Sequence, residues 1–188
     1  MNKKVLGVCV VLMAVAMLAI PVMASATEKI EVSFESGPFF GVCFPVWKMR
    51  GDVQHGRNGI MGWEDCDITG VGISLVDGTL TKTYDYDINV YGVEPTIPPP
   101  PNFRLGKGVL HYKGELEFDD GTFEGNHVIT GEFQVFNSGF VLPYNSEGHA
   151  VYRGTGAYLG WTWVMSDVTV NGEAQFEAYM QIPQSKLP

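Results

Sequence analysis

Apolar and polar residues alternate along most of the chain after residue 28, which is the pattern of β-strands buried on one face. Four segments show this alternation, at residues 30–35, 80–90, 110–118 and 174–182. In the second segment, Leu80, Tyr84 and Tyr86 share the apolar face. Beyond residue 28, no stretch of ten or more residues has the apolar spacing of a helix. The sequence therefore predicts an all-β fold of about eight to ten antiparallel strands.

Turn-forming dipeptides separate the alternating segments. They are Asp77-Gly78, Asp120-Gly121 and Asn171-Gly172, and each is typical of a two-residue hairpin. Glycines inside the strands, such as Gly125 and Gly131, indicate bulges and tight bends, which closed or strongly curved sheets need. We therefore predict a single antiparallel β-barrel rather than a sandwich.

A proline-rich segment at 95–101 interrupts the strand pattern, because proline donates no hydrogen bond to a sheet. The alternative is that this segment separates two small domains, 27–91 and 105–188. The first of these would be marginally stable alone, since small domains bury too little surface. We expect a stiff proline crossing between two halves of one barrel domain at 27–188.

Residues 1–26 have the three parts of a secretory signal peptide. Lys3 and Lys4 precede an apolar run that extends to Ile20, and Ala24-Ser25-Ala26 supplies the small residues of a cleavage site. The alternative is an uncleaved membrane anchor, which needs about 20 apolar residues. Cleavage after the last alanine predicts a secreted or cell-envelope protein with no stable membrane span.

The charge of the mature chain is strongly negative. Loss of Lys3 and Lys4 from 12 basic residues leaves 10 against 21 acidic residues, a formal charge of −11. Nucleic acids are bound by neutralising their phosphates with Lys and Arg. The composition therefore argues against a nucleic-acid partner and against an anionic membrane surface, and it favours solubility.

Two cysteines, Cys43 and Cys66, are left after removal of the leader. An oxidising compartment would allow them to pair, and a disulfide closing a loop of about 24 residues would stabilise the fold by roughly 3 kcal/mol. The alternative is two free thiols. Two cysteines without matching histidines do not make a structural zinc site, so we predict no metal and no other cofactor.

The most distinctive string is Gly154-Thr155-Gly156-Ala157-Tyr158-Leu159-Gly160. It resembles the glycine-rich strand of the allene oxide cyclase and dirigent-like β-barrel superfamily, and the resemblance covers roughly residues 105–182. It implies a barrel that binds an apolar small molecule in its interior. No catalytic residue is transferred from the family, and the sequence holds no nucleophile elbow, zinc-protease motif or phosphate-binding loop.

Polar groups on inward-facing positions are the candidate site residues. His127 lies on the apolar face of its strand with Ile129 and Phe133, where it could act as an acid, a base or a ligand anchor. The alternative is a core histidine hydrogen-bonded to a tyrosine. Tyr84, Tyr86, His127 and Tyr158 are the candidate ligand-binding residues, and His127 is the candidate catalytic residue. The segment Arg50–Gly62, with His55 and Arg57, is predicted to be an exposed lid or contact loop.

Three classes of function remain compatible with the sequence. The favoured hypothesis is an exported, non-enzymatic barrel that binds a small apolar ligand or an envelope partner. The second is an isomerase or cyclase that acts on an apolar substrate inside the barrel. The third is a structural or adhesive surface module. Fold alone does not decide among them, and the sequence does not predict the oligomeric state.

Overall fold

The computed structural model describes residues 26–43, 46–91, 103–136 and 138–187. Within these ranges the chain forms ten strands and two 3-10 turns, so the predicted all-β fold is confirmed. The elements are β1 (Thr27–Glu35), β2 (Phe39–Cys43), β3 (Val46–Arg50), β4 (Val53–Gly70), β5 (Ile73–Val90), β6 (Phe103–Phe118), β7 (Gly121–Phe136), β8 (Val141–Gly154), η1 (Gly156–Tyr158), β9 (Thr162–Val170), β10 (Glu173–Pro183) and η2 (Gln184–Lys186). The signal-peptide residues 1–25 and the proline segment 95–101 lie outside the described residues.

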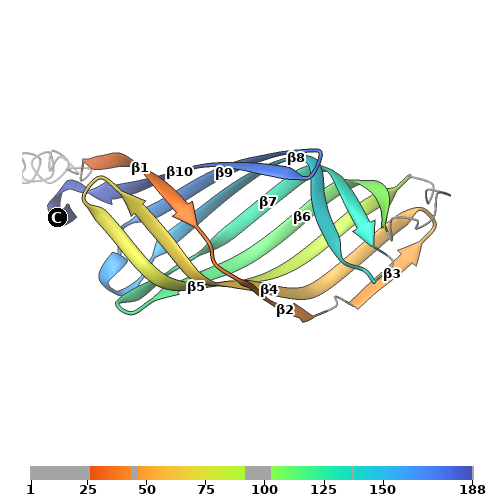
Figure 1. Cartoon of the computed structure of the whole chain (residues 1–188), viewed down its shortest axis with the longest axis horizontal. Helices are drawn as coiled ribbons and strands as arrows, with labels where there is room; N and C mark the ends of the chain where they lie inside the picture. The colour runs from red at the N-terminus through yellow and green to blue at the C-terminus, as the bar shows by residue number, and fades with distance from the viewer. Residues whose placement is uncertain (1–25, 44–45, 92–102, 137, 188) are drawn as a thin grey trace, which may run out of the picture.

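The strands form one antiparallel sheet that β1 closes into a barrel (Figure 1). The first residues of β1 pair with β10, and at Val32 the strand changes partner and continues along the end of β4. The ring therefore contains eight strands, β1 and β4 to β10, while β2 and β3 pair with other parts of β4. Strands on both sides of residues 92–102 belong to this one sheet, and β5 pairs with β6 directly. The segments 27–91 and 105–188, which the alternative treats as two small domains, therefore contribute strands to the same barrel.

One of the three predicted hairpin turns is confirmed. Asn171-Gly172 joins β9 to β10 with φ values of 52° and 85°, as a two-residue hairpin of this type requires. The turn between β6 and β7 lies one residue earlier than predicted: it consists of Asp119 and Asp120, and Gly121 begins β7 opposite Phe118. The prediction for Asp77-Gly78 is wrong, because Asp77 lies inside β5 with φ 59° at a shift in the β4–β5 register. The backbone N–H of Asp77 donates to the Asp67 carboxylate at 3.1 Å. The Asp77-Gly78 dipeptide marks a bulge here, since a bulge of this kind and a two-residue hairpin turn both need a positive φ.

The predicted loop at Arg50–Gly62 is also wrong. β3 and β4 form a hairpin through this segment, with a short turn between Arg50 and Val53. Gly51 is in this turn, while Gly56, Gly59 and Gly62 are strand positions covered by aromatic rings: a Cβ at Gly56 would lie 2.1 Å from the Tyr86 ring. The high glycine content therefore reflects close packing across the sheet, which sequence composition does not distinguish from a loop.

The predicted disulfide between Cys43 and Cys66 does not form. The backbone of Cys43 pairs with Ile60, whereas Cys66 is six residues further along β4. Six strand residues span roughly 20 Å, and a disulfide needs Cα atoms within about 7 Å. Cys66 is a buried free thiol, and burial raises the pKa of that thiol. The alternative of a free thiol is therefore the one observed for this residue.

Two groups of buried side chains fill the two ends of the barrel. One group surrounds Trp163, Phe123 and Ile68, and the other surrounds Tyr86, Phe133 and Leu110. Each end is therefore packed by large apolar side chains, as in a barrel of this size. None of the helical turns in the described ranges has the length and apolar character needed to cross a bilayer.

We predict that barrel closure depends on the absence of a side chain at Gly70. A Cβ there would lie 2.7 Å from the Glu31 carbonyl oxygen and 2.9 Å from Val32, where β1 crosses to β4. Gly70→Ala should lower the free energy of unfolding by about 1–3 kcal/mol, because the backbone of β1 must move away. Urea denaturation measures this change. Val71→Ala, at an 86% exposed neighbouring position, is the control, and equal stability of the two variants would contradict the closure described.

Candidate functional site

Three ionisable side chains are buried in the barrel between its two packed ends. Lys82 on β5, His127 on β7 and Asp167 on β9 are 5%, 3% and 3% exposed, respectively. All three occupy inward-facing positions of alternating strands: Lys82 lies between Leu80 and Tyr84 on the face that the sequence marks as apolar. Charged side chains are rarely buried to this extent unless they are paired. Their contacts therefore decide what the site can do.

His127 connects the cation to the anion. Its Nε2 is 2.6 Å from Asp167 Oδ1, and its Nδ1 is 3.4 Å from Lys82 Nζ. An ammonium group only donates hydrogen bonds, so Nδ1 accepts from Lys82 and Nε2 carries the hydrogen that is donated to Asp167. The result is a neutral imidazole held between a lysine and a carboxylate. Asp167 fixes the tautomer and leaves Nδ1 as the basic nitrogen.

The three side chains meet because glycines occupy the strands between them. Lys82 reaches across β6 at Gly114, where a Cβ would lie 3.1 Å from Lys82 Cγ. Asp167 reaches across β8 at Gly148, where a Cβ would lie 2.2 Å from the carboxylate Oδ1. Five neighbouring strands thus contribute lysine, glycine, histidine, glycine and aspartate in turn. The two glycines leave room for the charged groups to converge on His127.

Burial lowers the pKa of both Lys82 and His127. Desolvation lowers the pKa of Lys82 to about 8, and the negative charge of Asp167 limits this fall. Desolvation also lowers the pKa of His127; the hydrogen bond that His127 donates to Asp167 opposes that change, and the charge of Lys82 adds to it. His127 is therefore neutral at pH 7, while Lys82 is close enough to its pKa to exchange a proton readily.

A cavity of about 500 Å³ opens beside these residues, and Lys82, His127 and Asp167 all line it. The rest of the lining is largely apolar and comes from both packed ends, with Leu80 and Met165 from one and Met61 and Ile129 from the other. Ligand pockets typically combine such apolar walls with a few convergent polar groups. The barrel is therefore filled at its ends and open in its middle.

The cavity has an entrance in the barrel wall. Between Glu173 and Glu177, β10 pairs with β9 but not with β1, which has already turned towards β4. Phe176 lies on the inward-facing side of β10 yet is 56% exposed, and Phe39 across the gap is 44% exposed. Both rings line the cavity. Exposed apolar side chains at a gap of this kind are typical of an entry route for an apolar molecule.

Aromatic rings surround the Lys82 amine. Nζ lies 5.2 Å from the centre of the Tyr112 ring and 5.6 Å from that of Trp63. Such contacts stabilise a cation in a desolvated place. The nearby Tyr152 hydroxyl is fully buried and has no hydrogen-bond partner among the described residues, while its ring stacks on Trp163 at 4.9 Å. Its proximity follows from Gly114, where a Cβ would contact both this hydroxyl and Lys82.

Of the four candidate ligand-binding residues, His127 is the one that lines the cavity. Its hydrogen-bond partner is Asp167 rather than a tyrosine, although the Tyr112 ring lies 5.6 Å away. Tyr84 and Tyr86 belong to one packed end of the barrel and stack on each other with ring centres 6.5 Å apart. Tyr158 belongs to the other end, stacked on Phe123 at 5.1 Å.

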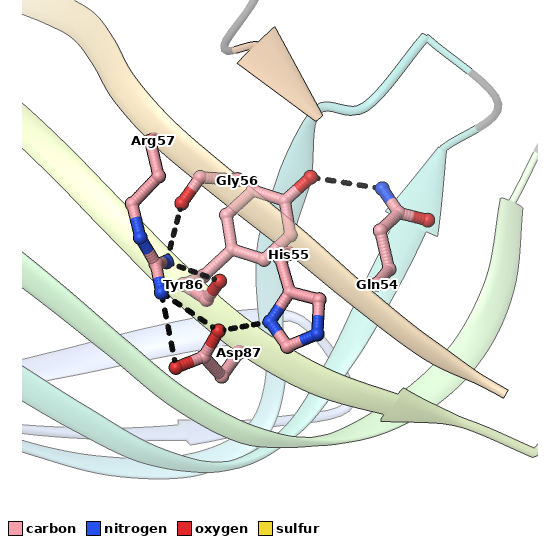
Figure 2. Close-up of polar contacts among 6 residues, drawn as sticks. All are labelled: Gln54, His55, Gly56, Arg57, Tyr86 and Asp87. Atoms are coloured by element: carbon pink, nitrogen blue, oxygen red, sulfur yellow. Dashed lines mark hydrogen bonds and ion pairs between the residues drawn. The ribbon is translucent and has the colours of Figure 1, made fainter. Parts of the chain in front are cut away.

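Figure 2 shows where Tyr86 and the predicted contact residues lie. The Tyr86 hydroxyl donates to the Gly139 carbonyl oxygen at 2.6 Å and accepts from Gln54 Nε2 at 2.8 Å, so its polar group is satisfied internally. His55 and Arg57 both contact the Asp87 carboxylate, and the hydrogen bond from His55, with that from Arg57, lowers the pKa of this carboxyl. This cluster is half exposed and separate from the cavity.

Lys82 and Asp167 are the site residues that sequence reasoning missed. A signal for both was present, since each interrupts the apolar face of a predicted or neighbouring strand. Lys82 lies between Leu80 and Tyr84, and Asp167 follows Trp163 and Met165 at spacing two. A charged residue inside an apolar alternation indicates either a polar site or an error in register.

Comparisons with protein-family models, curated proteins and solved structures give no match for the chain. The resemblance of residues 154–160 to the allene oxide cyclase and dirigent-like superfamily therefore stays a prediction. In the structure this string is not a strand: it ends β8, forms η1 and leads to β9.

We predict that Gly148→Ala separates Asp167 from His127. The added methyl group would occupy the place of the carboxylate, so the hydrogen bond that raises the pKa of His127 is lost. The pKa of His127 should fall further, as measured by NMR titration of the imidazole. An unchanged His127 titration in a folded variant would show that Asp167 does not control this imidazole.

Proposed function

We propose that this protein is an exported β-barrel that binds one small, largely apolar ligand in its interior, without catalysing a reaction on it. The observation that carries the proposal is the cavity of about 500 Å³ between two packed barrel ends. Lys82, His127 and Asp167 provide a polar end to an otherwise apolar space, and Phe39 and Phe176 flank its entrance. This combination favours an elongated molecule with one polar group.

The charges in the site favour a ligand without net charge. Lys82 and Asp167 balance each other across a neutral His127. An anionic ligand would lie close to the Asp167 carboxylate, and a cationic ligand would lie close to the Lys82 amine. Either would leave an uncompensated charge in a desolvated place, which is energetically costly. An alcohol or a carbonyl compound can instead accept a hydrogen bond from Lys82 at no such cost.

The superfamily resemblance of residues 154–160 supports the same proposal, since it implies an apolar molecule inside a barrel. Export is supported by the leader at residues 1–26 and by the position of β1, which begins at Thr27 directly after the predicted cleavage site. Together these features favour a ligand carrier in the envelope or outside the cell over an intracellular enzyme.

We predict that decanol binds in the cavity and quenches the fluorescence of Trp63, which lines it. Each added methylene contributes about 0.8 kcal/mol when buried. Decanol should therefore bind about tenfold more tightly than octanol, and decanoate should bind more weakly than decanol because of its charge. Fluorescence titration measures all three affinities.

Ile129→Phe and Val128→Phe are a matched pair of variants for this binding experiment. Ile129 lines the cavity, whereas the neighbouring Val128 points outward and is 37% exposed. The first variant should weaken decanol binding and the second should not. Absence of decanol binding to the folded wild type would refute the proposal and favour a structural or adhesive module.

A second candidate function is isomerisation of a substrate by proton transfer. The observation that favours it is the pairing of a cavity-lining imidazole with Asp167 at 2.6 Å, which orients His127 as a general base. We predict that such a base would speed deuterium exchange at the carbons beside the carbonyl of methyl octyl ketone by at least about a hundredfold.

Exchange in heavy water is followed by NMR, with His127→Gln as the variant that lacks the base. The variant should bind the ketone yet exchange no faster than buffer. If the wild type also exchanges at the buffer rate while it binds the ketone, the isomerase function fails and the binding function stands.

Export makes a separate prediction. Protein isolated from its own host should begin at Thr27, because cleavage follows Ala26. N-terminal sequencing of the envelope and extracellular fractions measures this. A chain that retains its first 26 residues in the membrane fraction would instead establish the anchor alternative.

A further inference from the structure

The Lys82 amine is arranged as an activated nucleophile at the polar end of the cavity. One of its N–H groups points to His127 Nδ1 at 3.4 Å, and the other nitrogen of that imidazole is held by Asp167 at 2.6 Å. A nucleophile, a base and a carboxylate that orients the base are the components of covalent catalysis and covalent capture. All three residues line the same cavity.

We infer that Lys82 captures aldehydes and ketones covalently, as an imine, inside the barrel. This inference rests on the proposed function, because the carbonyl compound must first enter the cavity. It names the chemical class of the ligand: a neutral, apolar chain that ends in a carbonyl group. Binding would then be reversible but slow to release, since the imine must be hydrolysed before the ligand leaves.

The reaction balances with the groups present. His127 Nδ1 takes a proton from Lys82, whose nitrogen lone pair forms a bond to the carbonyl carbon while the C=O π electrons move to oxygen. The protonated His127 returns its proton to this oxygen and gives a carbinolamine. Loss of the oxygen as water, after a second proton transfer from the nitrogen through His127, forms the C=N bond. Starting from the ammonium form of Lys82, the net change is carbonyl plus ammonium to protonated imine plus one water, and His127 is neutral again at the end.

The site distinguishes Lys82 from the other lysines of the folded chain. Lys29, Lys48, Lys107, Lys113 and Lys186 are all exposed, whereas Lys82 is buried beside His127. The pKa of Lys82 is about 8, so roughly a tenth of the amine is in the reactive neutral form at pH 7, on the order of a hundred times more than for a lysine in a free peptide, whose pKa is near 10.4. The apolar walls also keep water away from the imine.

Decanal with sodium cyanoborohydride tests the inference on the purified mature protein. The reagent reduces an imine to a stable secondary amine, and peptide mass spectrometry locates the alkyl group. Lys82 should be labelled at least tenfold faster than any exposed lysine. Lys82→Arg keeps the charge but should abolish this label, and His127→Gln should slow it at least tenfold while the exposed lysines label as before.

Decanol, which has no carbonyl group, separates this inference from the proposed function. If decanol binds in the cavity but decanal labels Lys82 no faster than the exposed lysines, covalent capture is refuted and the binding function stands. If decanol does not bind and Lys82 is not labelled, both fail. Preferential labelling that excess decanol suppresses supports both, because the two molecules then compete for one cavity.

Discussion

The burial of one charged amine is the constraint on which the interior of this barrel depends. Lys82 is only 5% exposed, and a buried charge is tolerated only with a compensating partner. Asp167 supplies the opposite charge from four strands away, and His127 lies between the two residues and forms a hydrogen bond with each. Glycines on the two intervening strands make this convergence possible. The middle of the barrel is therefore polar on one side, and apolar packing is confined to the two ends.

The same organisation explains why a cavity and an entrance occur together. β1 closes the ring by pairing first with β10 and then with β4, which leaves the beginning of β10 without β1 as a neighbour. Phe39 and Phe176 flank this gap instead of packing inside it. The cavity behind this gap is lined by Met61, Leu80 and Ile129 together with Lys82 and His127. Closure of the ring and access to the site are thus consequences of one strand changing partner.

The alternation of apolar and polar residues was sufficient to predict antiparallel strands, because period two sets which side chains face inward, and the glycines inside the strands favoured a barrel. It also placed His127 on the inward face. It could not place Asp77-Gly78 or the Arg50–Gly62 hairpin, since glycine and positive φ occur in bulged strands as well as in turns. The disulfide prediction failed for a different reason. The number of residues between two cysteines does not determine their separation in the sheet, and Cys43 pairs with β4 six residues away from Cys66. Lys82 and Asp167 each interrupt an apolar alternation, but their convergence on His127 depends on register across five strands, which no local pattern contains.

The most direct test of this account is the ionisation of Lys82 itself, followed by NMR of the labelled Cε carbon as pH rises. Desolvation beside His127 predicts a midpoint of about 8, because the neutral amine is favoured in the barrel interior. A Lys82 midpoint at the ordinary lysine value, near 10.4, would mean that the amine is in water. The buried polar site, and the functions proposed for it, would then be contradicted.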